Sequence, residues 1–295
     1  MSKYIVSGGT GFVGRALVSH LRSRGDDVEV LSRREGQNHI VWDPMSPGPW
    51  QEALDGCDGV VHLAGAPIAG QRWTEGYKRA IEQSRLRSTE LLVAGLGVAK
   101  KKPGVFVSAS AVGFFGANRP GEVLDEKSAP GDDFLARVCR GWENAAAAAT
   151  PKHGVRSVRV RFGVVLGEGG GALDRMVLPL GVGVGVVGRG DNAFSWVHLD
   201  DVVGLLVRAL DDPDWQGTYH AIGPEPATQR EVAGALAAAM GRPVIPAPTA
   251  VVRLGLGDAV EVFTGSIDAR PRHTLAAGYA FRFPTLEGAA TAVLG

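Results

Sequence analysis

The chain has 295 residues, with 31 lysines and arginines against 31 aspartates and glutamates, so no bulk charge favours nucleic acid or an anionic membrane. Its two cysteines, Cys57 and Cys139, are too few for a disulfide framework, and this favours a reducing compartment. No apolar run reaches membrane-spanning length, and the apolar stretch at 4–6 is too short for a signal peptide, so we expect a cytoplasmic protein without nucleic-acid or membrane partners.

Short apolar runs alternate with helical patterns from the first residues onward. Strands are predicted at 4–6, 28–31, 40–42, 59–63, 105–107 and 155–161, and helices at 12–24, 77–101 and 134–149. This alternation predicts the α/β class. We expect a Rossmann-type doubly wound parallel sheet, in strand order 3-2-1-4-5-6, with a smaller C-terminal substrate-side lobe.

The same pattern predicts how the chain is divided. Residues 1–165 are expected to form the NADP-binding Rossmann domain, with a strand and a helix returning to it from 194–222. Residues 166–295 are expected to form mainly the substrate-side lobe, with a C-terminal module at about 245–295. The glycine-rich run at 181–188 is interpreted as an irregular active-site loop, or alternatively as a connector, and the proline-rich run at 243–248 as a joint. We expect residues 167–192 to cover the nicotinamide half of the cofactor.

Three glycines lie where the first predicted strand meets the first predicted helix. Gly8, Gly11 and Gly14 form G-x-x-G-x-x-G within S-G-G-T-G-F-V-G. Glycine there permits a tight turn, close approach of the backbone to a pyrophosphate, and close helix–strand packing. The following helix offers unpaired N–H groups and a partial positive charge to the phosphates. The pattern predicts a dinucleotide site, with a ligand-free glycine turn as the alternative.

The end of the second predicted strand indicates which dinucleotide binds. An NAD site usually has an acidic residue about 20 positions beyond the glycines, where it binds the ribose 2′-hydroxyl. This chain has Arg33 nineteen residues after Gly14, followed by Arg34, whereas Asp26 and Asp27 come too early. An arginine suits the extra phosphate of NADP through charge-assisted hydrogen bonds. We therefore predict NADP(H) as the cofactor, with two solvated surface arginines as the alternative reading.

Motifs along nearly the whole chain resemble those of the extended short-chain dehydrogenase/reductase superfamily. Three of them are G-G-T-G-F-V-G at 8–14, D-G-V-V-H-L-A-G at 58–65 and V-S-A-S-A-V-G at 107–113. The resemblance is narrowed by W-T-E-G-Y-K-R-A-I-E-Q-S-R at 73–85, L-D-E at 124–126, W-E at 142–143, R-F-G-V-V-L-G at 161–167, S-W-V-H-L-D-D at 195–201 and A-R-P-R-H-T-L-A-A-G-Y-A-F-R-F-P-T-L-E at 269–287. The chain is similar to an atypical branch often called epimerase family proteins or nucleoside-diphosphate-sugar epimerases. The C-terminal segment of that branch is a small domain of unknown function.

The resemblance implies NADP as the cofactor and assigns residues to it. It implies that Ser32 and Arg33 bind the 2′-phosphate and that Leu63 and Ala64 make backbone contacts under the adenine and ribose. It also implies that Arg85 reaches the cofactor from the helix that crosses the sheet, and that Val164 contacts the nicotinamide. Further cofactor contacts are expected from residues inside the motifs, namely Gly8, Thr10, Gly11, Phe12, Val13, Gly14, Gly65 and Ser108.

The superfamily's usual proton-transfer pair is missing. Its chemistry uses a serine or threonine together with Tyr and Lys spaced Y-x-x-x-K, where the tyrosine exchanges a proton and the lysine lowers its pKa. Ser110 matches the serine position, and we predict it as the catalytic candidate. In one alignment Leu135 and Cys139 occupy the tyrosine and lysine positions, and a shift of one residue gives Phe134 and Val138.

Other side chains offer substitute groups, each with a structural alternative. Cys139 is either core packing or a reactive thiol, and His198 is either a helix cap or core residue or a general acid. The acidic pair at 200–201 is interpreted first as a helix cap, and the spacing assigns no role to Glu126 or Glu143. No cluster of His, Cys, Asp and Glu has metal-ligand spacing, so no metal is predicted.

Two classes of function follow from these patterns. The first is an NADP(H)-dependent oxidoreductase or epimerase that acts on an unidentified small molecule with non-standard proton-transfer groups. The second is a non-catalytic NADP(H)-binding redox sensor or regulatory protein. The missing Tyr–Lys pair favours the second class, whereas the glycine-rich run and the substrate-side lobe favour the first.

Overall fold

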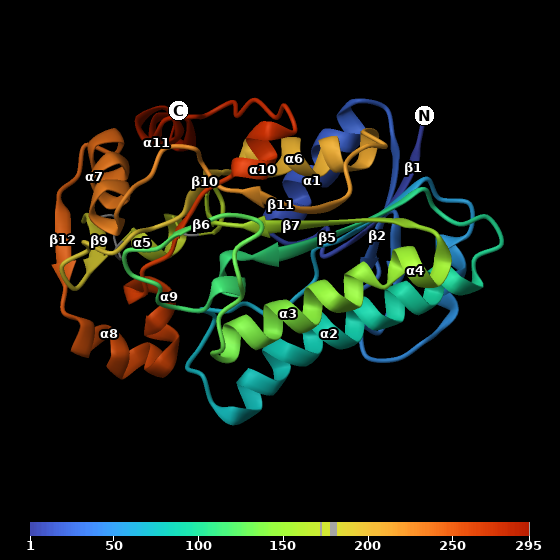
Figure 1. Ribbon diagram of the computed structural model, residues 1–295, viewed down its shortest axis with the longest axis horizontal. Coiled ribbons are helices and arrows are strands. Elements are labelled where there is room, and N and C mark those ends of the chain that lie inside the picture. The colour runs from blue at the N-terminus through green and yellow to red at the C-terminus, as the bar shows by residue number, and fades with distance from the viewer. Residues whose placement is uncertain (172, 178–181, 295) are drawn as a thin grey trace.

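A seven-stranded sheet forms the centre of the protein (Figure 1). The computed structural model describes residues 1–171, 173–177 and 182–294. Every neighbouring pair of strands in the sheet is parallel. In sheet order the strands are β11 (Gly217–Ala221), β7 (Arg156–Phe162), β5 (Val105–Ala111), β4 (Gly59–His62), β1 (Lys3–Ser7), β2 (Asp27–Ser32) and β3 (His39–Val41). The predicted order 3-2-1-4-5-6 is confirmed, with β11 as an additional strand outside β7.

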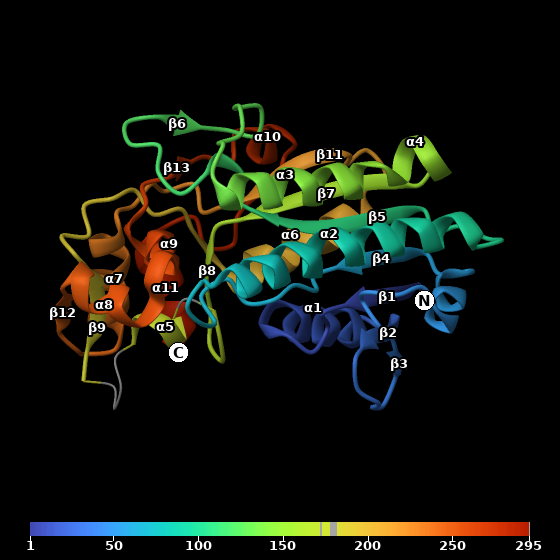
Figure 2. The same cartoon turned by 90° about the horizontal axis from the view of Figure 1, so that it is seen from below.

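Helices cover both faces of this sheet (Figure 2). One face is covered by α1 (Phe12–Ser23) and α6 (Leu199–Asp211), and the other by α2 (Glu75–Val98), α3 (Phe134–Ala147), α4 (Ala149–His153) and the 3-10 helix η1 (Pro49–Leu54). Along β5, Val105 and Val107 join the core under α1, whereas Phe106 joins the core under α2. A strand buried on both faces needs apolar residues at successive positions, which explains the short apolar runs of the sequence. The Rossmann-type doubly wound fold is confirmed.

A smaller lobe lies beyond the carboxyl ends of the strands (Figure 1). Outside the central sheet, β8 (Val164–Leu166) pairs with β10 (Trp196–His198), β9 (Val184–Val187) with β12 (Val244–Ala247), and β6 (Val123–Leu124) with β13 (Asp268–Ala269). The remaining helices are η2 (Val112–Phe115), α5 (Leu173–Met176), α7 (Gln229–Ala239), α8 (Thr249–Leu256), η4 (Gly257–Val260), α9 (Glu261–Thr264), α10 (Arg272–Ala276) and α11 (Leu286–Leu294). The lobe has its own core, in which Val184 of β9 packs with Leu236 of α7 and Ala289 of α11.

The glycine-rich and proline-rich runs differ from the prediction. Val184–Val187 is a regular strand, not an irregular loop, and it pairs in parallel with Val244–Ala247, which was predicted as a joint. The valines of β9 alternate in burial, with Val184 and Val186 fully buried. Period-two alternation therefore outweighed the glycines, because the valines supply one apolar face to the lobe core. Residues 178–181, at the start of the glycine-rich run and before it, lie outside the described residues.

Candidate functional site

The turn from β1 to α1 depends on its glycines. Gly8 has a φ of 72°, in the left-handed region that favours glycine, and its carbonyl accepts a hydrogen bond from the N–H of Gly11 at 2.9 Å. A Cβ on Gly14 would lie 2.1 Å from the carbonyl oxygen of Gly8, so only glycine lets the helix pack this closely on the turn. The N-cap residue of α1 is Gly11, which has no side chain to cap the first turn. Its backbone N–H groups are therefore available to an anion.

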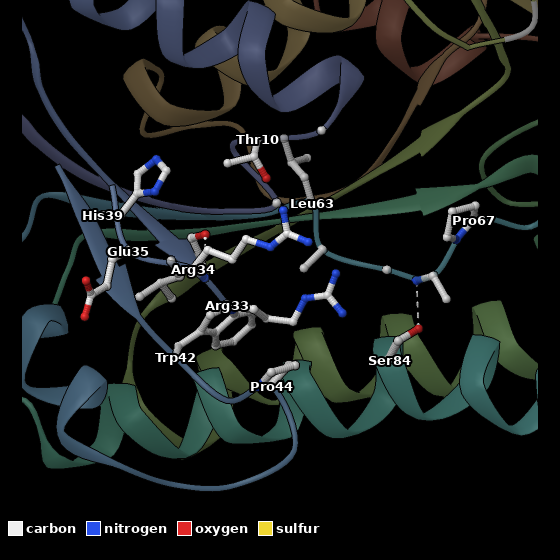
Figure 3. A pocket seen from close by; sticks show the side chains of 17 residues that line it. Thr10, Arg33, Arg34, Glu35, His39, Trp42, Pro44, Leu63, Pro67 and Ser84 are labelled. Carbon is white, nitrogen blue, oxygen red and sulfur yellow. Dashed lines mark hydrogen bonds between the residues drawn. The ribbon is translucent and has the colours of Figure 1, made fainter. Parts of the chain in front are cut away.

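A cleft with a volume of about 750 Å³ opens at this turn (Figure 3). It lies at the carboxyl ends of β1, β2 and β4, where open α/β sheets bind their ligands. Of the residues predicted to bind the cofactor, those that line the cleft are Gly8, Thr10, Gly11, Ser32, Arg33, Leu63, Ala64 and Gly65. The other lining residues are Leu31, Arg34, Glu35, His39, Trp42, Pro44, Ala66, Pro67 and Ser84.

The charge of the cleft comes from two arginines at the end of β2. The side chains of Arg33 and Arg34 extend from β2 across the cleft (Figure 3). Within the described residues, neither guanidinium has a carboxylate within 4.0 Å. The hydroxyl oxygen of Ser32 accepts the backbone N–H of Arg34 at 3.1 Å, so the hydroxyl hydrogen of Ser32 stays available. Two unpaired cations and a hydroxyl donor form an arrangement that suits a phosphate.

Arg85 lies at the far end of the cleft without forming part of its lining. Its guanidinium donates to the carbonyls of Ala66 at 3.0 Å and Ile81 at 3.1 Å, and its Cζ lies 5.2 Å from the ring centre of Trp142. A Cβ on Gly65 would lie 3.0 Å from that Cζ, so glycine makes room for the guanidinium. Burial lowers the pKa of Arg85 from its usual value. Arg85 thus stands next to the segment predicted to pass under the cofactor.

The remaining predicted cofactor residues are not among those that line the cleft. Phe12, at the start of α1, contacts Gly170 and Gly171 of the loop after β8, and Val13 is half-buried beside it. Part of the predicted cover at 167–192 therefore does lie against the glycine turn, although positions 172 and 178–181 are outside the described residues. Ser108 is fully buried, and its hydroxyl donates to the carbonyl of Ala109 at 3.0 Å. Val164 is half-buried in β8.

Ser110 belongs to a buried polar network. Its hydroxyl donates to Oε1 of Glu143 at 2.7 Å. Arg161 donates to both oxygens of the same carboxylate, from Nε at 2.7 Å and from Nη2 at 2.9 Å, and its Cζ lies 3.4 Å from the ring centre of Phe114. Ser110 is 2% exposed and Arg161 is 3% exposed. The hydroxyl hydrogen of Ser110 is therefore directed at Glu143, and Ser110 is not among the residues that line the cleft.

The positions of the missing pair are apolar, with Cys139 buried and Leu135 half-buried. Leu135 packs in a cluster with Trp73 and Ile81, which residues of the C-terminal segment such as Leu256 complete. Cys139 is buried beside Gly113, and burial raises the pKa of its thiol to about 12. A thiol with so high a pKa is protonated at neutral pH and is a poor nucleophile. The structure thus shows packing at both positions.

His198 caps α6, and the acidic pair that follows it contacts the C-terminal segment. Nδ1 of His198 accepts the backbone N–H of Asp200 at 3.1 Å and so caps α6, and burial lowers the pKa of the imidazole. The carboxylate of Asp201 accepts the backbone N–H groups of Arg282 at 2.6 Å and Phe283 at 3.0 Å. The contact of His198 agrees with its capping interpretation. The acidic pair was wrongly interpreted as a cap of this helix, because Asp201 binds backbone N–H groups of the C-terminal segment and Asp200 pairs with Arg282 at 2.8 Å.

Several lining residues were not predicted as cofactor contacts, among them His39, Trp42 and Ser84. Trp42 and His39 come from β3 and its surroundings, and Ser84 from the middle of α2. Among these additional lining residues, only Arg34 could be expected from the sequence, because it follows Arg33. Within the described residues there is no group of three His, Cys, Asp or Glu that could hold a metal ion. In that same part of the chain no helix is both long and apolar enough to cross a membrane.

Comparison with known proteins identifies the family. Residues 4–223 match the model of the NAD dependent epimerase/dehydratase family. The chain belongs to this family. Residues 247–293 match a separate domain of unknown function, DUF1731, as the resemblance of the tail predicted.

Relatives that match nearly the whole chain place it within a narrower group. It is 38% identical over 294 residues to human epimerase family protein SDR39U1, covering 97% of this chain and 98% of the human protein. It is 35% identical over 302 residues to the Arabidopsis thaliana SDR39U1 homolog named chloroplastic, covering 98% of this chain and 86% of that protein. The predicted resemblance to epimerase family proteins is confirmed.

Solved structures agree with this placement. The crystal structure of human SDR39U1 isoform 2 with NADPH has a TM-score of 0.90 at 37% identity, and the match covers 99% of each chain. The nucleoside-diphosphate sugar epimerase of Corynebacterium glutamicum has a TM-score of 0.82 at 32% identity, covering this chain fully and 58% of that chain. UDP-glucose 4-epimerase of Thermus thermophilus, solved with NAD, shares the fold at 21% identity and a TM-score of 0.77.

Proposed function

We propose that this protein binds NADP(H) in the cleft above the β1–α1 turn and prefers it to NAD(H). The observation that carries the proposal is the pair of unpaired guanidiniums, Arg33 and Arg34, at the end of β2. An NAD site would have a carboxylate at this strand end, whereas the acidic lining residue Glu35 follows two arginines and is exposed. The NADPH bound to the human relative supports the same cofactor for this chain.

Calorimetry with NADPH and NADH tests this proposal. The unmodified protein should bind NADPH clearly more tightly than NADH. Arg33→Ala should weaken NADPH binding at least tenfold, because a hydrogen bond to a charged group contributes about 1.5–3 kcal/mol, and should leave NADH binding nearly unchanged. Arg140→Ala removes an exposed arginine of α3 that does not line the cleft, and serves as the matched control. Equal affinity of the unmodified protein for both cofactors would contradict the proposal.

Family membership supports an oxidoreductase or epimerase that acts on a small molecule with proton-transfer groups other than Tyr and Lys. A second candidate is a non-catalytic NADP(H)-binding sensor, and the network around Ser110 favours it. The one predicted catalytic side chain is 2% exposed and donates its hydrogen to Glu143. A carbonyl placed near the cofactor would thus meet no suitable acid from this network. Reduction of simple aldehydes and ketones by NADPH should be very slow, and rapid turnover in a carbonyl screen would decide for the enzyme.

We also propose a cytoplasmic location. Cys57 and Cys139 are both free and buried, which is compatible with a reducing compartment. Fractionation of cells that express the tagged chain would test this, since the Arabidopsis thaliana relative is named chloroplastic.

A further inference from the structure

The loop between β2 and β3 holds His39 against the cleft through two backbone features. Asn38 adopts a φ of 56°, in the left-handed region, and its carbonyl accepts the N–H of Val30 at 2.9 Å. The carbonyl of Gly36 accepts the N–H of His39 at 3.1 Å, and a Cβ on Gly36 would lie 2.3 Å from Nδ1 of His39. Left-handed backbone at a residue other than glycine is uncommon and needs surrounding structure to stabilise it. The loop is therefore folded tightly against the imidazole.

The two nitrogens of His39 are in different situations. Nδ1 is buried and has no hydrogen-bond partner within the described residues. Buried N–H groups without an acceptor are rarer than buried acceptors without a donor, which favours a ring hydrogen on Nε2 over one on Nδ1. With Nδ1 covered by Gly36, Nε2 is the nitrogen that this ring can offer to a ligand, and it offers a hydrogen-bond donor.

His39 lines the same cleft as the phosphate-binding candidates of β2. Figure 3 shows it beyond Arg34, on the side of the cleft where Thr10 lies. Together with Arg33 and Ser32, these side chains supply two guanidiniums, one hydroxyl and one imidazole donor. A phosphate monoester has three terminal oxygens, each able to accept more than one hydrogen bond. The donor set exceeds what a ribose hydroxyl would use and matches what a phosphate needs.

We propose that His39 is a ligand of the 2′-phosphate of NADP(H), to which it donates from Nε2 beside Arg33 and Arg34. His39 then helps to determine the preference for NADP(H) over NAD(H). This inference rests on the proposed function, because it places the 2′-phosphate in this cleft. It also gives a role to the packing of Nδ1 against Gly36, which leaves Nε2 as the nitrogen that can meet a ligand.

Binding of two adenine nucleotides distinguishes whether His39 contacts the phosphate or only packs in the loop. 2′,5′-ADP carries the 2′-phosphate and 5′-AMP lacks it, so calorimetry of both on the full chain isolates the phosphate contact. His39→Ala should weaken binding of 2′,5′-ADP and NADPH about tenfold or more and leave 5′-AMP and NADH unchanged, as expected for a lost hydrogen bond to a charged group. His39→Gln keeps a side-chain N–H donor and should recover most of the loss. His20→Ala removes an exposed histidine of α1 and should change nothing.

Two results would overturn the inference, and a third would overturn the function beneath it. Equal weakening of 2′,5′-ADP and 5′-AMP by His39→Ala would show that the ring only supports the loop. Unchanged binding of 2′,5′-ADP by His39→Ala, with strong weakening by Arg33→Ala, would show that the phosphate is bound without His39. Equal affinity of the unmodified protein for 2′,5′-ADP and 5′-AMP would instead refute the proposed cofactor preference. Retained 5′-AMP binding reports that each variant is folded.

Discussion

Ser110 donates its hydrogen to Oε1 of Glu143, and the same oxygen accepts a hydrogen bond from Nε of Arg161. These side chains are nearly inaccessible to solvent, so the carboxylate and the guanidinium are desolvated and interact with each other in place of water. A serine at the end of β5 thus matches a catalytic motif and at the same time donates to an ion pair between α3 and β7. The motif alone does not distinguish the two roles, because a serine at this strand position can serve either.

Removal of one charge from this pair should be strongly destabilising. Glu143→Ala leaves Arg161 buried without a counterion, and breaking a buried ion pair in this way costs about 3–5 kcal/mol. Glu143→Gln keeps an acceptor for Ser110 and should cost less. Urea unfolding of the variants measures the free energy directly. Glu90→Ala is the matched control, since its carboxylate forms an exposed pair with Arg87 at 3.7 Å and should contribute less than about 1 kcal/mol. Equal losses for Glu143→Ala and Glu90→Ala would contradict the ion-pair argument.

At the scale of elements, the sequence predicts those helices and strands whose apolar residues form a regular local pattern. The six strands and three helices of the Rossmann region were predicted in the correct order, because apolar runs buried on both faces stand out against amphipathic helices. β9 was missed for a different reason. Its four residues, Val184–Val187, include a glycine, and its partner β12 lies about sixty residues further along the chain. A short strand with a distant partner has no local signal that outweighs glycine.

Glu126 joins two elements that the sequence could not connect. Its Oε1 accepts hydrogen bonds from the backbone of His220 at 3.3 Å and of Thr274 at 3.2 Å, and from the Thr274 hydroxyl at 3.1 Å. Its Oε2 accepts the backbone N–H of His273 at 3.0 Å. The carboxylate therefore caps α10 of the C-terminal segment on the last strand of the sheet. The L-D-E motif and the R-P-R-H-T motif of the sequence meet here.

Loss of this cap should loosen the C-terminal segment. Glu126→Ala leaves several buried donors without an acceptor, which should lower the free energy of unfolding by roughly 2–4 kcal/mol. Glu126→Gln should also lower the free energy of unfolding, though by less, because the amide NH₂ of the glutamine would face backbone N–H donors. Hydrogen exchange at 268–276 measures the local effect. Glu122→Ala, at a half-exposed carboxylate paired with Arg119, is the control. Unchanged protection of 268–276 in Glu126→Ala would contradict this role.

At the scale of the whole molecule, the parts of the site that lie within a single sequence motif could be predicted. The glycine turn is one short stretch of sequence and the end of β2 is another, and eight of the predicted residues line the cleft. The lining from Trp42 and Ser84 comes from separate elements that only tertiary packing brings to the same edge. Arg85 and Ser108 lie near or beneath the cleft, and their contact with a cofactor stays a prediction.

Buried histidines give the whole molecule a common dependence on pH. His62 is fully buried between Ser7, which lies 2.6 Å from its Nδ1, and Ser88, which lies 3.1 Å from its Nε2. The Ser88 hydroxyl hydrogen is directed to the carbonyl of Ser84 at 2.6 Å, so His62 donates from Nε2 and accepts at Nδ1. Burial lowers the pKa of His62 to about 3, and burial likewise lowers the pKa of His220 to about 4. Both rings are neutral in the folded protein at neutral pH.

The sign of the pH effect follows from these shifts. Above pH 6.5, the usual pKa, the rings are neutral in both the folded and the unfolded states and do not change stability. Below pH 6.5, these histidines bind protons in the unfolded chain but not in the folded protein. The free energy of unfolding therefore falls as the pH drops toward the folded pKa values. Two groups over 1.5 pH units at 1.36 kcal/mol each amount to a loss on the order of 4 kcal/mol by pH 5.

Urea unfolding between pH 6.5 and pH 5 tests this, because in that window the lowered pKa values of carboxylates such as Asp125 do not yet contribute. His62→Gln can keep a donor and an acceptor for the two serines, but it cannot be protonated. The loss of stability between the two pH values should therefore be smaller than in the unmodified protein by the share of His62, about 2 kcal/mol. His20→Ala, at an exposed position of α1, should keep the full loss. If His62→Gln lost as much stability as the unmodified protein over this range, proton uptake by His62 on unfolding would be ruled out as the cause.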